Sequence, residues 1–353
     1  MSKFWSPTVA ELAPYVPGEQ PRDQQYIKLN TNENPYPPSP KIEDLLKGQQ
    51  IDELRRYPDP SSTDLVNALA RYYDVTATEV FVGNGSDEVL AHVFQAFFQK
   101  PDPLLMPDIS YSFYPVYCGL YHIDYRQISL DQDFRIDVDD YRQANGGIII
   151  PNPNAPTGTA LEIPAIRQLL ADNPESVIVI DEAYIDFGAD SCIPLIDEFP
   201  NLLVVQTFSK SRSLAGIRIG YAIGQAELIE GLQRVKNSFN SYPIDSISSQ
   251  IAVTALEDKT YFENCRDRII NNRSQLTADL LELGFEVLPS SANFIFARHP
   301  DFGAETLYLG LKEAGVLVRY FKKPRIDNFL RISIGTESEC GALLQTLKSL
   351  LSR

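Results

Sequence analysis

The chain has 353 residues, of which 44% are hydrophobic and 22% are charged, a composition typical of soluble globular proteins. Its 47 acidic and 31 basic residues give a net charge of −16. This charge disfavours nucleic acid and anionic membrane surfaces as partners, because binding to both depends on lysine and arginine. A single core rarely extends over this length, so we expect two domains.

The apolar runs of the chain are of strand length, such as 148–150 and 177–180, whereas about 20 residues are needed to span a bilayer. The first residues lack the continuous apolar stretch of a signal peptide. The four cysteines lie far apart without a CxxC pair, and the chain has three histidines. These features predict a cytoplasmic protein with neither a disulfide framework nor a metal site.

The Pro-rich opening, residues 7–40, shows little periodicity, and we expect it to wrap over the surface. From residue 79 onward, short apolar runs alternate with amphipathic stretches, which predicts strands and helices in turn. The expected strands are 79–82, 103–106, 125–129, 147–150, 176–180, 202–207 and 217–223, with helices at 86–99, 162–171 and 226–236. Several strands are continuous Ile/Val/Leu runs, which indicates a sheet buried on both faces.

The pattern changes after residue 243. The expected elements there are helices at 245–257, 261–283, 303–314 and 337–351 and strands at 285–288, 293–297 and 329–334. We therefore predict an α/β fold in which helices cover both faces of a mostly parallel sheet, with a smaller α+β domain near the C-terminus. The large domain is expected over residues 32–243, and the small domain over residues 1–31 and 244–353.

Three short segments follow predicted strands, where open α/β sheets place their ligand sites. In 82–88, a glycine turn opens a helix whose free N–H groups suit a phosphate; an ordinary helix cap is the alternative. In 177–184, Asp181 ends an apolar strand, either facing a site or capping the next turn. In 207–218, Lys210 leaves another apolar strand among small hydroxyl residues, and a solvated lysine is the alternative. Together, a phosphate cradle, a strand-end aspartate and a lysine are what pyridoxal phosphate requires.

Segment 207–216 resembles the lysine signature of class II aminotransferases that depend on pyridoxal phosphate, and 181–184 and 156–158 are similar to two further landmarks of that family. Within this superfamily the chain resembles the histidinol-phosphate aminotransferases. The segments that carry this second resemblance are 12–18 (LAPYVPG), 28–35 (KLNTNENP), 56–58 (RYP) and 330–336 (LRISIGT). The landmarks extend from residue 12 to residue 336, nearly the whole chain.

The resemblance implies roles for three residues at the reacting centre. Lys210 would bond to the cofactor aldehyde, and its amine, once displaced by substrate, would move the substrate proton. Asp181 would pair with the pyridine nitrogen and keep it protonated. Tyr184 would donate a hydrogen bond to the phenolate oxygen, its alternative being a packed aromatic after a strand.

The resemblance also implies a set of residues that hold the cofactor. Tyr111 would stack on the pyridine face, and Tyr57 would reach the phosphate from the neighbouring subunit of a homodimer with its active sites at the interface. The phosphate would lie against the backbone amides of Gly85, Ser86 and Asp87 and the side chains of Thr207, Ser209 and Arg218.

One position departs from the family pattern. The family often has asparagine directly before the Pro-Thr-Gly landmark, where it contacts the phenolate oxygen, but this chain has Ala155. Alanine cannot donate that hydrogen bond. Either Asn154 takes the role through a different turn, or Tyr184 makes the contact alone.

For the substrate, the resemblance implies Arg331, Arg319 and Tyr15. One pocket would hold the phosphate of histidinol phosphate and then the carboxylates of glutamate or 2-oxoglutarate, and the planar guanidinium group suits both anions. The implied reaction converts L-histidinol phosphate and 2-oxoglutarate to imidazole-acetol phosphate and L-glutamate in histidine biosynthesis.

Other functions stay open from the sequence. On the same fold, the chain could be an aromatic amino acid aminotransferase or a threonine-phosphate decarboxylase. A non-catalytic homologue that senses pyridoxal phosphate is a third alternative, which the Lys210–Asp181 pair disfavours. A dinucleotide-binding module is disfavoured because 83–88 lacks the third glycine of that fingerprint.

Overall fold

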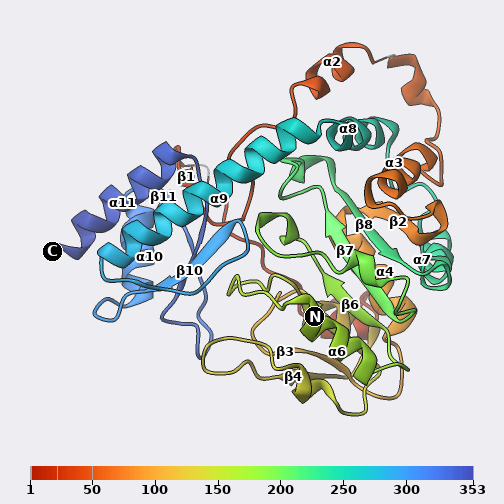
Figure 1. Cartoon of the computed structure of the whole chain (residues 1–353), viewed down its shortest axis with the longest axis horizontal. Coiled ribbons are helices and arrows are strands. Elements are labelled where there is room, and N and C mark those ends of the chain that lie inside the picture. Colours follow the sequence, from red (N-terminus) through yellow and green to blue (C-terminus); the bar gives the residue numbers. More distant parts are fainter. Residues whose placement is uncertain (1, 22, 50, 353) are drawn as a thin grey trace.

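The computed structural model describes residues 2–21, 23–49 and 51–352 (Figure 1). The largest sheet within these ranges has seven strands. Their order across the sheet is β2 (Val80–Asn84), β8 (Ile219–Gly224), β7 (Leu202–Thr207), β6 (Ile178–Asp181), β5 (Gly147–Pro151), β3 (Leu104–Pro107) and β4 (Tyr125–Ile128). The strands from β7 to β4 are parallel, and β8 is antiparallel to both of its neighbours. The mostly parallel sheet expected from the sequence is confirmed.

Helices cover both faces of this sheet because its central strands are apolar on both sides. In β6, Ile178 and Ile180 pack into one hydrophobic cluster, and Val179, which points to the opposite face, packs into another. The first cluster includes residues of α3 (Thr63–Tyr73), α6 (Ile163–Asp172) and α8 (Ser246–Glu257). The second includes residues of α4 (Gly85–Phe97), α5 (Tyr114–Tyr121) and α7 (Ala226–Phe239).

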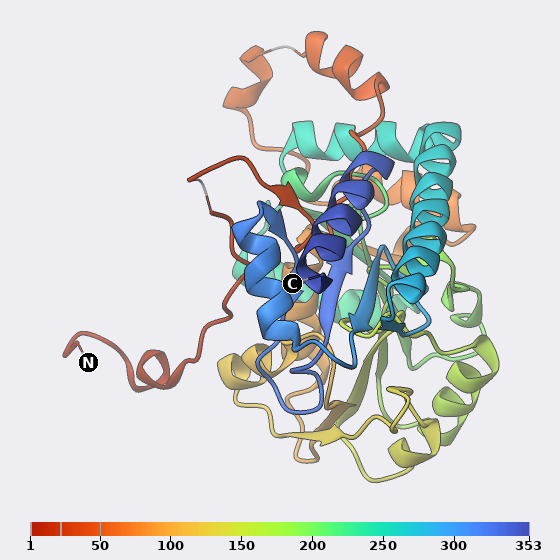
Figure 2. The same cartoon turned by 90° about the vertical axis from the view of Figure 1, so that its left-hand side faces the viewer.

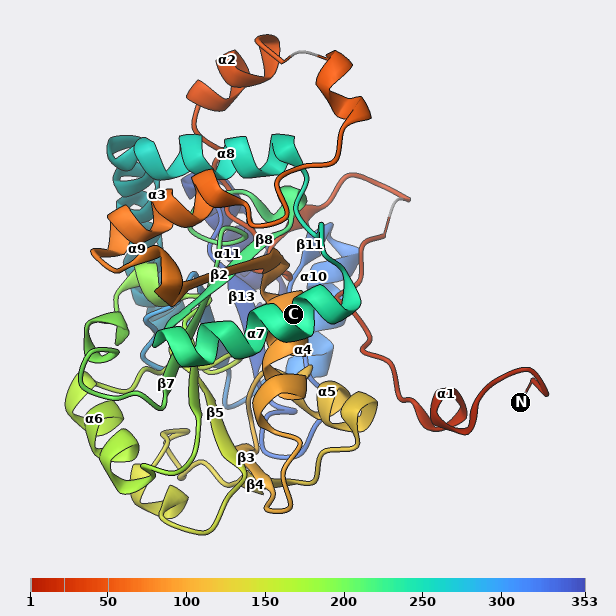
Figure 3. The same ribbon diagram turned by 90° about the vertical axis from the view of Figure 1, so that its right-hand side faces the viewer.

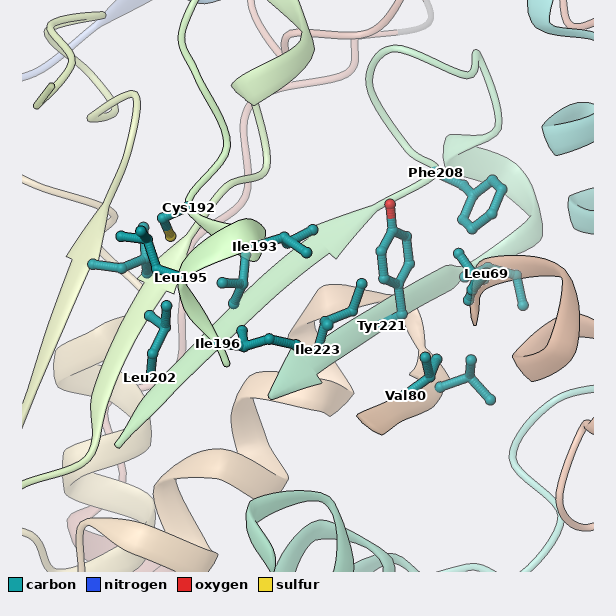
Figure 4. Close-up of a cluster of buried hydrophobic side chains, with 14 of the residues drawn as sticks. Leu69, Val80, Cys192, Ile193, Leu195, Ile196, Leu202, Phe208, Tyr221 and Ile223 are labelled. Carbon is teal, nitrogen blue, oxygen red and sulfur yellow. The ribbon is translucent and has the colours of Figure 1, made fainter. Parts of the chain in front are cut away.

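Figure 4 shows part of the first cluster, where Leu69 of α3 and Ile196 lie in one group with Tyr221 and Ile223 of β8. Leu69 and Ile223 are fully buried. Each fully buried side chain of this size contributes about 1.5–3 kcal/mol to folding. The cluster makes the sheet a rigid platform, so the loops that leave its strands have fixed starting points.

A second sheet is antiparallel throughout. Its order is β12 (Arg319–Tyr320), β13 (Leu330–Ser333), β10 (Phe294–Arg298) and β9 (Glu286–Val287). Residues of α9 (Lys259–Glu282), α10 (Ala304–Glu313) and α11 (Glu337–Leu351) share its hydrophobic cluster. The long helix α9 runs from α8 to this sheet (Figure 1).

The N-terminal segment differs from its prediction. Helix α1 (Pro7–Glu11) has no buried residue and extends away from the body (Figures 2 and 3). Strand β1 (Ile27–Lys28), however, pairs with β11 (Val316–Leu317), and the chain that follows is buried at Leu29, Asn30 and Asn32. The expectation of a surface segment is therefore wrong for Leu29, Asn30, Asn32 and Tyr36, which are buried. Individual contacts rather than a continuous apolar face bury these residues, so the stretch has no hydrophobic period.

Two further helical segments, α2 (Lys41–Lys47) and the 3-10 helix Ile51–Arg55, form a protrusion on the molecule (Figure 3). No helix in the described part of the chain is long and apolar enough to cross a membrane.

Candidate active site

A cavity of about 370 Å³ lies at the carboxyl ends of β5, β6 and β7. We call it the central cavity. The second sheet, the chain before α2, the start of α4 and residues 110–112 also line it. It brings together most of the residues that the sequence singled out: Tyr15, Ser86, Asp87, Tyr111, Asp181, Tyr184, Thr207, Ser209, Lys210, Arg218, Arg319 and Arg331.

One end of the cavity is formed by the start of α4. Gly85 has φ +76°, and a Cβ there would lie 2.5 Å from Arg218 Nη2, so the position requires glycine. Gly220 of β8 lets the strand pass under the helix, because a Cβ would lie 2.2 Å from the Ser86 nitrogen. The first N–H groups of a helix have no partner within the helix, so this end of α4 offers donors to an anion.

Side chains add positive charge and hydroxyl groups to the same end. Arg218 Nη2 donates to Asp87 Oδ2 over 2.9 Å, and its backbone has φ 55°. Thr207 Oγ1 donates to Ser209 Oγ over 3.0 Å and accepts from the Ser209 backbone nitrogen over 3.1 Å. A guanidinium group, two hydroxyls and a helix N-terminus together form a cradle for a phosphate.

Asp181 lies at the end of β6 and is 5% exposed. Its Oδ2 accepts a hydrogen bond from the Tyr114 hydroxyl over 2.7 Å, and its Oδ1 accepts one from the Ala183 backbone nitrogen over 3.2 Å. Burial raises the pKa of this carboxyl to about 6. It is a buried acceptor on the wall of a ligand-sized cavity, a combination common at functional sites.

Glu182, the next residue, is 1% exposed and holds the loop after β6. Its carboxylate accepts hydrogen bonds from Ser191 Oγ, the Cys192 backbone nitrogen and Gln206 Nε2 over 2.7–2.8 Å. Burial raises the pKa of Glu182 to about 7. The two neighbouring acids therefore differ in role: Asp181 lines the cavity, whereas Glu182 stabilises the loop after β6.

Lys210 follows β7 and projects its Nζ to within 3.4 Å of the Thr31 carbonyl oxygen. Its Nζ also lies 5.7 Å from the centre of the Tyr184 ring. The Tyr184 hydroxyl accepts a hydrogen bond from Asn32 Nδ2 over 3.0 Å, and Asn32 is bonded in turn to Ser333 of β13. The amine thus lies between the two sheets, beside an oriented phenol.

Sequence reasoning missed Thr31 and Asn32. Both belong to the 28–35 landmark, which served to recognise the family but suggested no role for these residues. Asn32 has φ 55°, a conformation that asparagine adopts more readily than most residues. Within 31–34, two asparagines flank a glutamate, and this polar run was the signal in the sequence that could have pointed to a role for the segment.

The second sheet supplies a pair of arginines. Arg331 of β13 lies directly opposite Arg319 of β12. Arg331 Nη2 donates to the Asn30 carbonyl oxygen over 2.9 Å, but its buried Nε has no hydrogen-bond partner among the described residues. Burial lowers the pKa of the Arg331 guanidinium. An anion in the cavity would satisfy the Nε donor and offset this desolvation.

Aromatic rings form another wall of the cavity. The Tyr15 ring centre lies 4.8 Å from that of Phe113 and 6.4 Å from that of Tyr111. The Tyr111 hydroxyl donates to Asp87 Oδ1 over 3.1 Å, which links this wall to the phosphate cradle.

Two of the residues singled out lie elsewhere. Asn154 is buried outside the cavity, where its amide donates to the Ile109 carbonyl oxygen and to Thr157 Oγ1; Ala155 lines the cavity instead. Tyr57 is 83% exposed, and its ring stacks on Tyr242 at 4.9 Å, apart from the cavity of its own chain.

The sequence pattern of the family described as aminotransferase class I and II matches residues 24–347, in agreement with the fold and the site. The chain is 58% identical over 350 residues to the histidinol-phosphate aminotransferase of Pseudomonas syringae pv. syringae, covering 99% of this chain and 100% of that one. It is also 58% identical over 349 residues to the histidinol-phosphate aminotransferase of Chromohalobacter salexigens, covering 99% of each.

A crystal structure of histidinol-phosphate aminotransferase from Sinorhizobium meliloti in complex with pyridoxal-5'-phosphate has a TM-score of 0.89 to this fold, at 22% identity over 99% of both chains. The chain belongs to the histidinol-phosphate aminotransferase family of class I and II aminotransferases.

Proposed function

We propose that this protein transfers the amino group of L-histidinol phosphate to 2-oxoglutarate, producing imidazole-acetol phosphate and L-glutamate in histidine biosynthesis, with pyridoxal phosphate as cofactor. The observation that carries the substrate assignment is the arginine pair, in which the buried Arg331 Nε lacks a partner among the described residues. Identity to curated histidinol-phosphate aminotransferases disfavours an aromatic amino acid aminotransferase and a threonine-phosphate decarboxylase.

The residues of the central cavity fit pyridoxal phosphate. A cradle at the start of α4 suits the phosphate, the buried carboxyl of Asp181 suits a cationic ring nitrogen, and Lys210 is an amine within the same cavity. The bound cofactor supplies an aldehyde that receives the amino group and a ring that withdraws electrons from the reacting carbon.

Three residues of the central cavity then have defined tasks. Lys210 would hold the cofactor, and its Nζ would take the proton from the substrate carbon that bears the nitrogen. Asp181 Oδ would hold the proton on the ring nitrogen. The Tyr184 hydroxyl, oriented by Asn32, would donate to the phenolate oxygen in place of the asparagine that Ala155 replaces.

Tyr15, Arg319 and Arg331 would bind the substrate phosphate in one half-reaction and the glutamate carboxylates in the other. Arg331 is tied to the Asn30 carbonyl by one Nη2 hydrogen, which leaves its Nε and the remaining N–H groups for a bidentate contact. Closure of Tyr15 over the anion would exclude water from it.

We also propose a cytoplasmic homodimer with active sites at the subunit interface. Tyr57 would reach the phosphate cradle of the neighbouring copy. The α2 protrusion and the chain after it expose Leu46, Ile51, Leu54 and Tyr57, a concentration of apolar side chains that supports burial against a second subunit. Sedimentation of the protein at micromolar concentration tests the dimer.

The domain division 32–243 against 1–31 and 244–353 stays a proposal. Pairing of β1 with β11 supports grouping the N-terminal segment with the C-terminal part. Ile251 and Ala252 of α8, however, pack into the first cluster of the large sheet, which favours a boundary between α8 and α9.

The test of the proposed function is donor preference in steady-state assays. Formation of glutamate from 2-oxoglutarate is followed with L-histidinol phosphate, phenylalanine or threonine phosphate as donor. The proposal expects the highest kcat/KM with histidinol phosphate. Comparable or higher values with phenylalanine would contradict it, and release of carbon dioxide from threonine phosphate would favour the decarboxylase.

A further inference from the structure

Helix α5 contributes a residue to the site without lining the cavity. Tyr114, the first residue of α5, is fully buried, and its hydroxyl donates to Asp181 Oδ2 over 2.7 Å. Its ring packs edge-on against Tyr111, with centres 5.5 Å apart, and lies 6.1 Å from that of Phe94 in α4. Packing on two sides therefore fixes the position of the hydroxyl.

We propose that Tyr114 is a positioning residue that keeps the Asp181 carboxyl ionised and aimed into the central cavity. This inference rests on the proposed function, because Asp181 gains its task from the ring nitrogen of pyridoxal phosphate. Tyr114 would touch neither cofactor nor substrate and would act through Asp181 alone.

The direction of the hydrogen bond follows from the chemistry of its two partners. An ionised carboxylate can only accept, so the phenol must donate to it. Burial and the nearby Asp181 raise the pKa of the Tyr114 hydroxyl, which therefore keeps its proton. A donor held against a carboxylate favours the charged form, and this opposes the burial that raises the pKa of Asp181.

Other charged and titratable groups face Asp181 from the surrounding elements. Asp87 of α4 raises its pKa, and Lys210 after β7 lowers it. The Ala183 backbone N–H is the second donor to the carboxylate, and Tyr117 of α5 lies near enough to be influenced by its charge. Within the described residues, Tyr114 is the only side chain that donates a hydrogen bond to Asp181.

Removing this donor has a predictable effect on the titration of Asp181. Losing a hydrogen bond to a charged carboxylate should raise the pH at which that carboxylate is half protonated by about one to two units. With Tyr114 donating to it, the Asp181 carboxyl has its pKa raised by burial to about 6. In Tyr114→Phe it should rise above neutrality, so at pH 7 much of the carboxyl would be protonated and unable to accept from a cationic ring.

The first test is an infrared pH titration of the full-length protein freed of cofactor. The carboxyl band of Asp181 is isolated by subtracting the spectrum of Asp181→Asn. Tyr114→Phe should move its midpoint upward by about one to two units. An unchanged or lowered midpoint overturns the inference, whether or not the protein proves to be the proposed aminotransferase.

Tyr141→Phe is the matched control. Tyr141 is 1% exposed, and its hydroxyl has no hydrogen-bond partner in the described part of the chain. It lies outside the central cavity, in the 3-10 helix Val138–Tyr141. This control removes a buried phenol oxygen but should leave the Asp181 midpoint in place. A similar shift in both variants would mean a general loosening of the fold and would overturn the role of Tyr114.

The second test uses protein loaded with pyridoxal phosphate that carries ¹⁵N in its ring. Since a more basic Asp181 draws the proton away from the ring, Tyr114→Phe should move the nitrogen resonance toward the position of neutral pyridine. The variant should also lower kcat with little change in KM. Tyr114→His, which keeps a ring N–H donor, should restore part of the resonance shift and part of kcat. If neither the resonance nor kcat recovers, Tyr114 does not act by donating a hydrogen bond to Asp181.

Failure of the two hypotheses can be told apart. If wild-type protein does not take up pyridoxal phosphate, the proposed function fails, while the infrared titration still decides whether Tyr114 controls Asp181. If wild-type protein binds the cofactor and transaminates, but Tyr114→Phe leaves the ring nitrogen and the infrared midpoint unchanged, only the inference about Tyr114 fails.

Discussion

Replacing Arg331 by lysine keeps a positive charge in the substrate pocket but removes a planar set of donors. In the structure, Arg331 uses one Nη2 hydrogen on the Asn30 carbonyl, and its buried Nε has no partner among residues 2–21, 23–49 and 51–352. Lysine cannot offer two parallel N–H groups to one phosphate. The variant should therefore lose at least one charge-assisted hydrogen bond to substrate, worth about 1.5–3 kcal/mol.

That loss corresponds to a decrease of about 10- to 150-fold in kcat/KM for histidinol phosphate. It should appear mainly in KM, because no bond of the phosphate is made or broken and it is bound equally in the ground and transition states. The assay compares kcat/KM for histidinol phosphate and for glutamate in Arg331→Lys and in Arg126→Lys. Arg126 is an exposed residue of β4, so its substitution is the control.

Both half-reactions should weaken in Arg331→Lys, since the same guanidinium serves the phosphate and the carboxylates. Wild-type KM values for both substrates would refute the assignment of Arg331. A large fall in the thermal midpoint would instead assign Arg331 a mainly structural role, through its bond to the Asn30 carbonyl.

Three other changes probe separate parts of the site. Asp181→Asn should lower kcat by roughly 100-fold or more through loss of a preorganised charge, and near-normal kcat would remove Asp181 from the mechanism. Gly85→Ala, strained at φ +76° and crowded by Arg218, should weaken binding of pyridoxal phosphate by roughly 10-fold, whereas Gly341→Ala, with open space around it, should not. Glu182→Gln tests pH-dependent stability. Burial raises the pKa of Glu182 in the folded protein to about 7, above its ordinary value of 4.5 in the unfolded chain, so the wild-type free energy of unfolding should fall as pH rises from about 4.5 to 7. Glu182→Gln should lack this part of the decrease. If the free energy of unfolding depends on pH in the same way in both proteins, the raised pKa of Glu182 is contradicted.

Elements with a strong hydrophobic pattern could be predicted closely from the sequence. Strand β7 has the predicted bounds, and so does α11, because each combines an apolar run or stripe with clear end signals. Helix α5 was missed. Its sequence, YPVYCGLY, is rich in tyrosine and carries no amphipathic stripe, so packing on α4 and on Asp181 rather than propensity explains the helix. Strands β1 and β11 have two residues each, too few to show a period.

The residues of the site likewise divide into those that a local sequence pattern predicts and those that it does not. Asp181 and Lys210 could be singled out because Asp181 ends the buried apolar strand β6 and Lys210 follows the buried apolar strand β7, where parallel sheets place functional groups. The contacts of Asn32 with Tyr184 and of Thr31 with Lys210 join residues more than 150 positions apart. They depend on how the N-terminal segment lies between the two sheets, which no local pattern encodes. Tyr114 was missed for the same reason as its helix.

The central claim is that Lys210, Asp181 and the arginine pair carry out amino transfer from histidinol phosphate. The most direct test is the absorption spectrum of the protein loaded with pyridoxal phosphate, recorded before and after adding histidinol phosphate without any keto acid. The wild type should convert fully to the spectrum of the pyridoxamine form at low substrate concentration, and Lys210→Ala should not. An unchanged wild-type spectrum with histidinol phosphate, together with conversion by phenylalanine, would contradict the proposed substrate.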